Sequence, residues 1–216
     1  MDELNILAIS GSLRAASLNT ALLRAARKHA PAGVAVTVFD RLGEVPPYNG
    51  DLDTDALLPP AVGELRAAVT AADGLLIAMP EYNYSVPGVL KNALDWASRP
   101  VGASSLLHKD IAVLGASPGN FGTARGQLAL RQVLVATHSR VVQRPEVLVF
   151  AAHTRFDEAG NLTDDGTVAL LEELLATLRD QISSLPPTAK ISSKKSTVGS
   201  PTSTVTLPSA AVPTER

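Results

Sequence analysis

The feature that most constrains the fold is a regular alternation of short apolar runs with longer amphipathic segments. The short runs are apolar throughout and often β-branched, whereas the longer segments repeat their apolar residues at helical spacing. Strands buried on both faces have this continuous apolar character, and their alternation with helices is typical of a parallel sheet. The expected strands cover residues 4–10, 34–39, 74–79, 111–116 and 141–150, the last of them interrupted by Pro145. The expected helices cover residues 17–30, 60–72, 87–97, 123–138 and 164–184.

Right-handed crossovers between these strands predict an α/β fold with helices on both faces of the sheet. We expect a three-layer flavodoxin-like sandwich with a five-stranded parallel sheet of order 2-1-3-4-5. Ligands of such sheets bind beyond the carboxyl ends of the strands, near the point where the strand order reverses. The loops after the first, third and fourth strands are therefore the candidates for function.

Composition narrows the classes of protein that the chain can belong to. The 216 residues are 45% hydrophobic and carry a formal net charge of -2, which provides a core and argues against a nucleic-acid-binding surface. The absence of cysteine excludes disulfides, thiolate metal sites and a cysteine nucleophile. The acidic N-terminus and the lack of a membrane-length apolar run predict a cytoplasmic protein that binds neither membranes nor nucleic acid.

The C-terminal segment differs in composition from the rest of the chain. Residues 186–216 contain 17 Ser, Thr or Pro residues and a net charge of +3, which leaves -5 for the preceding part. A segment with no aromatic residue buries too little apolar surface to offset its ordering entropy. We therefore predict one folded domain, residues 1–185, and a disordered Ser/Thr/Pro-rich tail, residues 186–216.

The loop after the first expected strand has the properties of a phosphate site. It joins small polar side chains and one arginine to a helix N-terminus, whose free N–H groups and partial positive charge suit an anion. The loop has neither the dinucleotide nor the P-loop spacing of glycines, so it favours a single phosphate on a small ligand. A plain polar turn capped by Ser17 is the alternative. The polar residues are Ser10, Ser12, Arg14, Ser17, Asn19 and Thr20.

The loop after the third expected strand, residues 79–88, holds two of the three tyrosines of the chain between two prolines. A stiff loop that presents Tyr82, Tyr84 and the amide of Asn83 suits a flat aromatic ligand. Packing of the tyrosines as local core is the equally weighted alternative.

The loop after the fourth expected strand, residues 115–123, is rich in glycine and matches the Gly-x-Ser-x-Gly pattern of hydrolase nucleophile elbows around Ser117. Glu146 and His153 follow in the order of a catalytic triad. The short spacing and Pro118, which lacks the N–H of an oxyanion hole, make a serine hydrolase an unfavoured alternative.

Taken together, the three loops resemble the signatures of the NADPH-dependent FMN reductase family. The resemblance rests on Ser10-Gly11-Ser12-Leu13-Arg14 with Ser17-Leu18-Asn19, on residues 80–96 and on Gly115-Ala116-Ser117-Pro118-Gly119 followed by Arg125 and Gln127. It extends over about residues 4–182 and leaves the tail without a counterpart.

The resemblance implies a bound FMN, with NADPH or NADH as co-substrate and a small molecule as electron acceptor. Quinones, azo compounds, metal oxyanions and free flavin are the implied acceptors in a ping-pong reaction. No side chain is expected to be catalytic, and Tyr82 and Asn83 are implied only as positioning groups. The implied phosphate residues are Ser10, Ser12, Arg14, Ser17, Leu18 and Asn19, and the implied ring-binding residues are Pro80, Glu81, Tyr82, Asn83, Ser117 and Gly119.

The resemblance also implies a homodimer or homotetramer with the helix after Pro87 at the interface, where Leu90 and Trp96 are expected to make contacts. Two non-enzymatic alternatives remain, an FMN electron carrier and an FMN or nucleotide sensor. The mild, mixed charge of residues 1–185 favours the enzyme over a carrier, because carriers dock through strongly acidic surfaces.

Overall fold

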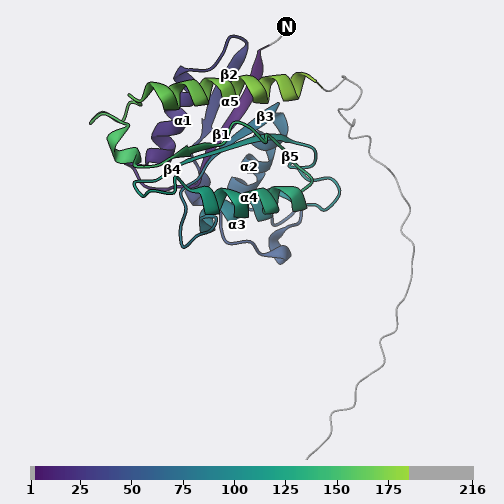
Figure 1. The fold of residues 1–216 in the computed structure, drawn as a ribbon. Coiled ribbons are helices and arrows are strands. Elements are labelled where there is room, and N and C mark those ends of the chain that lie inside the picture. Colours follow the sequence, from purple (N-terminus) through teal and green to yellow (C-terminus); the bar gives the residue numbers. More distant parts are fainter. Residues whose placement is uncertain (1–2, 185–216) are drawn as a thin grey trace, which may run out of the picture. The chain divides into compact units, whose positions relative to one another are not determined.

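The sheet has the predicted order and direction. The computed structural model describes residues 3–184, and in it a parallel sheet has the order β2-β1-β3-β4-β5, with β6 also paired to β4 (Figure 1). Gly11 extends the first strand, because its N–H donates to the carbonyl of Ala78 at 2.7 Å. The strands are β1 (Leu4–Ser10), β2 (Val34–Phe39), β3 (Gly74–Ala78), β4 (Asp110–Ala116), β5 (Arg140–Val141) and β6 (Val147–Val149).

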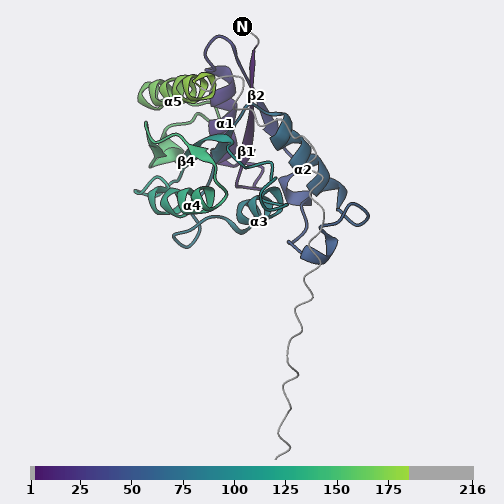
Figure 2. The ribbon, with the colours of Figure 1, turned by 90° about the vertical axis from the view of Figure 1, so that its right-hand side faces the viewer.

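Helices cover both faces of this sheet, as predicted. Figure 2 shows α1 (Leu18–Lys28) and α5 (Asp165–Ser183) on one face, with α2 (Pro60–Ala71), α3 (Gly88–Ala97) and α4 (Ala124–Ala136) on the other. Ser17 and Asp164 cap α1 and α5 through side-chain oxygens that accept backbone N–H groups, as these residue types do at helix N-termini. Three short 3₁₀ turns lie at Leu42–Glu44, Gly50–Leu52 and Ala152–Thr154.

Each face of the sheet has its own hydrophobic core, because successive strand residues point to opposite sides. In β3, Leu75 and Ile77 pack under α2, α3 and α4, whereas Leu76 and Ala78 pack under α1 and α5. All four side chains are fully buried. The strand is therefore apolar at every position, which explains why the sequence shows a continuous run rather than an alternating pattern.

The fifth expected strand is interrupted near Pro145, as the sequence indicates, and the interruption divides it into two separate strands. Asp110 pairs with Arg140 and Leu114 pairs with Val147, so four positions along β4 correspond to seven along the partner strand. The interruption contains Pro145, which has no N–H to donate to a sheet. One predicted strand over residues 141–150 is thus two short strands, β5 and β6, along the same edge of β4.

The expectation that Leu90 and Trp96 lie at a subunit interface is wrong. Both side chains have 0% exposure within the single chain. The indole Nε1 of Trp96 donates to the carbonyl of Pro46 at 2.8 Å, and the ring packs edge-on against Tyr48 at 4.8 Å. The connection between β2 and α2 covers this part of α3, and sequence periodicity does not distinguish that cover from a partner subunit.

Two further expectations concern membrane-spanning helices and the C-terminal tail. Within residues 3–184, no helix is long and apolar enough to cross a membrane. The predicted tail, residues 186–216, lies outside the described residues.

Candidate functional site

The three loops singled out in the sequence meet at the carboxyl edge of the sheet. A Cβ atom on Gly11 in the first loop would lie 3.3 Å from Pro80 in the second. The side chain of Asn19 bonds to the backbone of Ala116 at the start of the third. Arg125, which follows the third loop, pairs with Glu81 in the second. The strand order places these loops side by side, and direct contacts hold them together.

The first loop ends in a capped helix with free donors. The Oγ atom of Ser17 accepts the N–H of Thr20 at 3.2 Å. The N–H groups of Leu18 and Asn19 have no acceptor within residues 3–184, as expected for the first turn of a helix. The Arg14 side chain is exposed and forms no ion pair with any described residue. The polar-turn alternative is therefore correct about the cap, and the loop still offers two N–H groups without a described acceptor and one exposed cation.

Two polar side chains of this loop point inward rather than toward a ligand. The Asn19 amide is 4% exposed; its Nδ2 donates to the Ala116 carbonyl at 3.0 Å and its Oδ1 accepts the Ala116 N–H at 2.9 Å. The Ser10 hydroxyl bonds to Thr20 Oγ1 at 2.8 Å and accepts the Ser12 N–H at 3.3 Å. Asn19 therefore offers a ligand only its backbone N–H.

The second loop is a tight hairpin with exposed tyrosines. The backbones of Tyr82 and Ser85 exchange two hydrogen bonds, and the two residues between them, Asn83 and Tyr84, have φ angles of 49° and 66°. Positive φ at both central residues defines a type I′ turn, which a tyrosine rarely occupies. Tyr82 and Tyr84 are 48% and 68% exposed, whereas Pro80 is buried beneath them. The tyrosines are thus not packed as local core.

The third loop closes tightly over the end of β4. A Cβ atom on Gly115 would lie 2.6 Å from the carbonyl oxygen of Met79, so no larger residue fits without a backbone shift. Gly122 and Thr123 both have left-handed backbones, with φ of 53° and 73°. Ser117 Oγ accepts the Gly119 N–H at 3.1 Å, which holds these two predicted site residues together at the edge of the loop.

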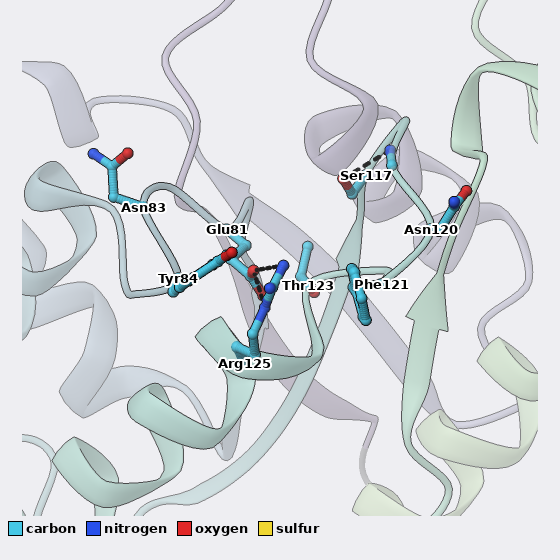
Figure 3. Close-up of a pocket in the computed structure, with 9 residues that line it drawn as sticks. Glu81, Asn83, Tyr84, Ser117, Asn120, Phe121, Thr123 and Arg125 are labelled. Carbon is cyan, nitrogen blue, oxygen red and sulfur yellow. Dashed lines mark hydrogen bonds and ion pairs between the residues drawn. The ribbon is translucent and has the colours of Figure 1, made fainter.

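A cavity of about 290 Å³ lies between the second and third loops (Figure 3). Four of the predicted ring-binding residues line it: Glu81, Asn83, Ser117 and Gly119. Pro80 and Tyr82 belong to the same hairpin but do not contribute to the lining. The residues that complete it are Tyr84, Asn120, Phe121, Thr123 and Arg125.

An ion pair that the sequence analysis did not predict joins the walls of this cavity. The Glu81 carboxylate, whose side chain is 8% exposed, accepts the Arg125 guanidinium at 2.7 and 2.8 Å and the Gly126 N–H at 2.9 Å. The guanidinium lies 3.7 Å from the ring centre of Tyr84 and 4.3 Å from that of Phe121 (Figure 3). Glu81 and Arg125 are 44 positions apart, and no spacing rule pairs residues at that separation.

Ser117, Glu146 and His153 do not form the hydrogen bonds of a catalytic triad within residues 3–184, as a serine hydrolase would require. Ser117 Oγ bonds to the Gly119 N–H, and Glu146 pairs with Arg144 at 3.2 Å. No hydrogen bond within residues 3–184 joins Ser117 to His153. The same part of the chain holds no group of three or more His, Asp or Glu residues placed to bind a metal ion.

Comparisons with known proteins agree with this geometry. Residues 4–154 match the model of the NADPH-dependent FMN reductase family. An NAD(P)H-dependent FMN reductase of Pseudomonas aeruginosa is 46% identical over 178 residues, which are 82% of this chain and 95% of the relative. A quinone reductase of Escherichia coli is 36% identical over 168 residues, or 77% and 89% of the two chains.

A solved structure extends the likeness to three dimensions. The flavoenzyme FerB, an NAD(P)H:(acceptor) oxidoreductase from Paracoccus denitrificans, superimposes with a TM-score of 0.75 at 34% identity and covers 83% of this chain and 97% of its own. The family match spans all three loops of the site, and the relatives are covered over most of their length. The chain therefore belongs to the NADPH-dependent FMN reductase family of oxidoreductases.

Proposed function

We propose that the protein is an FMN-dependent oxidoreductase that transfers electrons from NADPH or NADH to quinones, with azo compounds, metal oxyanions and free flavin as related acceptors. In the overall reaction NAD(P)H, a proton and a quinone give NAD(P)⁺ and a hydroquinone. The observation that best supports this function is that the N-terminal end of α1, with its free N–H groups, and the hairpin that carries two tyrosines lie at the same edge of the sheet. FMN, when bound, supplies the hydride chemistry, so the chain's task is to bind, orient and expose it.

The first loop fits one phosphate group. The N–H groups of Leu18 and Asn19 and the exposed guanidinium of Arg14 are donors without partners in residues 3–184, and all suit a phosphate dianion. The absence of a side chain at Gly11 allows the loop to lie against Pro80 and Leu90. A Cβ atom there would lie 3.3 Å from Pro80 and 3.2 Å from Leu90. Ser10, Ser12 and Ser17 contribute by shaping this cradle, through the hydrogen bonds already described.

The cavity between the second and third loops fits a flat ring system. We propose that the isoalloxazine lies beside Glu81 and Asn83 on one side and Ser117 and Gly119 on the other. Pro80 and Tyr82 border it as parts of the same hairpin. The buried Glu81 carboxylate is fully engaged by Arg125 and Gly126, so it supports the wall rather than acting as an acid or base. Tyr82 and the Asn83 amide are positioning groups, since no described side chain activates either of them.

A binding comparison tests the phosphate assignment. Replacing Arg14 with Ala removes one charge-assisted contact, for which about 1.5–3 kcal/mol predicts a loss of about 10–150-fold in FMN affinity. Riboflavin lacks the phosphate, so its affinity is expected to stay unchanged. Arg27→Ala, at the opposite end of α1, is the matched control and keeps wild-type affinity for both. An equal loss of FMN and riboflavin affinity for Arg14→Ala would contradict the assignment.

An anaerobic titration tests the activity itself. The FMN-loaded protein is mixed with NADPH or NADH, and the visible absorbance of the flavin is followed. We expect bleaching that benzoquinone reverses. Bound FMN that stays oxidised would indicate a carrier or sensor, and a failure to bind FMN would refute the proposal.

We further propose a homodimer or homotetramer located in the cytoplasm. Leu128 and Val135 support the assembly, because they lie two turns apart on α4 and are 60% and 70% exposed. Sedimentation of the wild type and of Leu128→Glu tests it. A monomeric wild type would refute the assembly.

A further inference from the structure

Arg125 lies at a position that is ordinarily unfavourable for a cation. A cation in the first turn of a helix opposes the helix dipole, and Arg125 is the second residue of α4. The Glu81 carboxylate offsets this unfavourable charge by pairing with Arg125, and it also accepts the Gly126 N–H of the same turn. The carboxylate alone would stabilise this helix end, so Glu81 explains how Arg125 is tolerated there but not what it contributes.

What Arg125 contributes is contact with two rings from different loops. Tyr84 belongs to the hairpin after β3, and Phe121 belongs to the loop after β4. The guanidinium lies between them, 3.7 Å from one ring centre and 4.3 Å from the other. Figure 3 shows the arginine rising from α4 between the two aromatic side chains, with Glu81 behind it. Tyr84, Arg125 and Phe121 form a stack, called here the arginine stack.

Neither ring is held by the core. Tyr84 is 68% exposed and Phe121 is 62% exposed. Tyr84 also has a left-handed backbone, so its own local conformation does not favour its place. The guanidinium is the cation that contacts both rings, and its position is fixed by the buried Glu81. Arg125 therefore links two exposed rings to a buried carboxylate.

These rings and Arg125 all line the cavity between the second and third loops. We propose that Arg125 is a specificity-determining positioning residue, which holds Tyr84 and Phe121 so that the site favours planar conjugated electron acceptors such as quinones over compact ones. A planar acceptor gains from contact with ordered rings. A compact octahedral anion such as ferricyanide gains nothing from them. This inference rests on the proposed function, since it concerns acceptors at the same site.

The decisive variant is Arg125→Lys. Lysine keeps the positive charge and reaches toward Glu81, but it lacks the planar group that stacks between two rings. We expect kcat/KM for benzoquinone to fall about tenfold, a change typical of one or two exposed cation–π contacts. The value for ferricyanide, two ions of which take the two electrons, is expected to fall less, so that the ratio of the two values changes. Arg179→Lys is the matched control, because Arg179 also has a 37% exposed side chain in an ion pair but contacts no ring.

A second pair of variants tests the rings themselves. Tyr84→Phe keeps the ring and is expected to retain wild-type selectivity. Phe121→Leu removes one side of the stack and is expected to lower the benzoquinone value in the same direction as Arg125→Lys. Wild-type selectivity in Phe121→Leu would overturn the proposal.

Hydrogen–deuterium exchange of the apoprotein supplies a readout without the cofactor. The Ser85 N–H bonds to the Tyr82 carbonyl across the hairpin at 3.0 Å, so its exchange reports opening of that turn. We expect exchange at Ser85 to be about tenfold faster in Arg125→Lys than in the wild type or in Arg179→Lys. Unchanged exchange would overturn the positioning role even if activity changed.

The outcomes separate this inference from the proposed function. A wild type that fails to bind FMN or to be reduced by NAD(P)H refutes the function, while the exchange measurement still decides the positioning role. A wild type that reduces quinones, with an Arg125→Lys variant that slows both acceptors equally or neither, leaves the function intact and overturns the inference.

Discussion

Replacing Asn19 with Ala tests the strongest structural link between the first and third loops. The Asn19 amide is 4% exposed and satisfies both backbone groups of Ala116, which is itself 2% exposed. Alanine removes both of the hydrogen-bond partners of Ala116. No described polar side chain takes their place. The N–H and the carbonyl of Ala116 would then be buried without hydrogen bonds, which is one of the few ways in which a single substitution is severely destabilising.

The expected magnitude follows from the two orphaned groups. Each unsatisfied buried backbone group costs about 1–3 kcal/mol, so the free energy of unfolding should fall by about 2–6 kcal/mol. That is a large share of the roughly 5–15 kcal/mol typical of a domain. Asn19→Asp should be destabilised as well at neutral pH, because a buried carboxylate faces the Ala116 carbonyl. Its deficit should shrink as the pH falls, since burial raises the pKa of such a carboxyl and protonation restores a donor.

Urea unfolding of the apoprotein measures this effect directly. Trp96 is the single tryptophan of the chain and is fully buried, so its fluorescence reports the loss of the α3 core. Asn120→Ala is the control, because Asn120 is an exposed amide of the third loop and surface changes of this kind usually stay within about 0.5 kcal/mol. A fall of less than about 1 kcal/mol in the free energy of unfolding of Asn19→Ala would refute this reasoning. The Asn19 side chain would then be a candidate for direct contact with the phosphate.

Two further predictions use the same unfolding assay. Gly115→Ala should lower the free energy of unfolding by about 1–3 kcal/mol through overpacking, because its Cβ would lie 2.6 Å from the Met79 oxygen. Gly88→Ala should not, because its Cβ would meet no described atom within 4 Å beyond its chain neighbours and its own helix turn, and equal effects would contradict the packing argument. Asp164→Ala should cost about 1 kcal/mol at pH 7 by removing the α5 cap. Hydrogen bonds from Thr167 lower the pKa of Asp164, so this difference should be complete above the ordinary aspartate pKa of about 4 and should vanish as the pH falls through the lower folded value; a difference that persists in acid would contradict it.

Local patterns were sufficient to predict the layers of the fold. The strand Leu4–Ser10 and the cap at Ser17 agree with the structure, because burial on both faces and helix capping leave signatures within a few residues. The predicted fifth strand was less accurate. Pro145 marked the interruption, but the extra residues between β5 and β6 depend on pairing with β4, and pairing between distant segments leaves no local pattern.

The burial of Trp96 shows the same limit for surfaces. An apolar stripe on a helix indicates that something covers it, and the stripe is the same whether the cover is a partner subunit or a segment of the same chain. Here the carbonyl of Pro46, some 50 positions away, receives the indole N–H. The resemblance implied that a partner subunit covers Trp96. The path of the connection between β2 and α2 shows that the same chain covers it.

The candidate site shows why a list of polar residues overstates the number of ligands. In the sequence, Asn19 and Glu81 look like groups that touch a bound molecule. In the structure their side chains bond to Ala116, Arg125 and Gly126, so they fix the three loops relative to one another. A site assembled from separate loops needs such links, because a ligand bound by mobile loops must also offset the entropy of ordering them.

This division of roles has a consequence for mutagenesis of the site. A residue that touches the phosphate, as proposed for Arg14, changes FMN affinity but not riboflavin affinity. A residue that links loops, such as Asn19, shifts both ligands together, because it changes the population of the binding-competent arrangement rather than one contact. The ratio of the two affinities therefore separates ligands from links without any further structure. A chain that contains both classes within six positions is well suited to that comparison, since Arg14 and Asn19 both lie at the N-terminal end of α1 and in the same cradle.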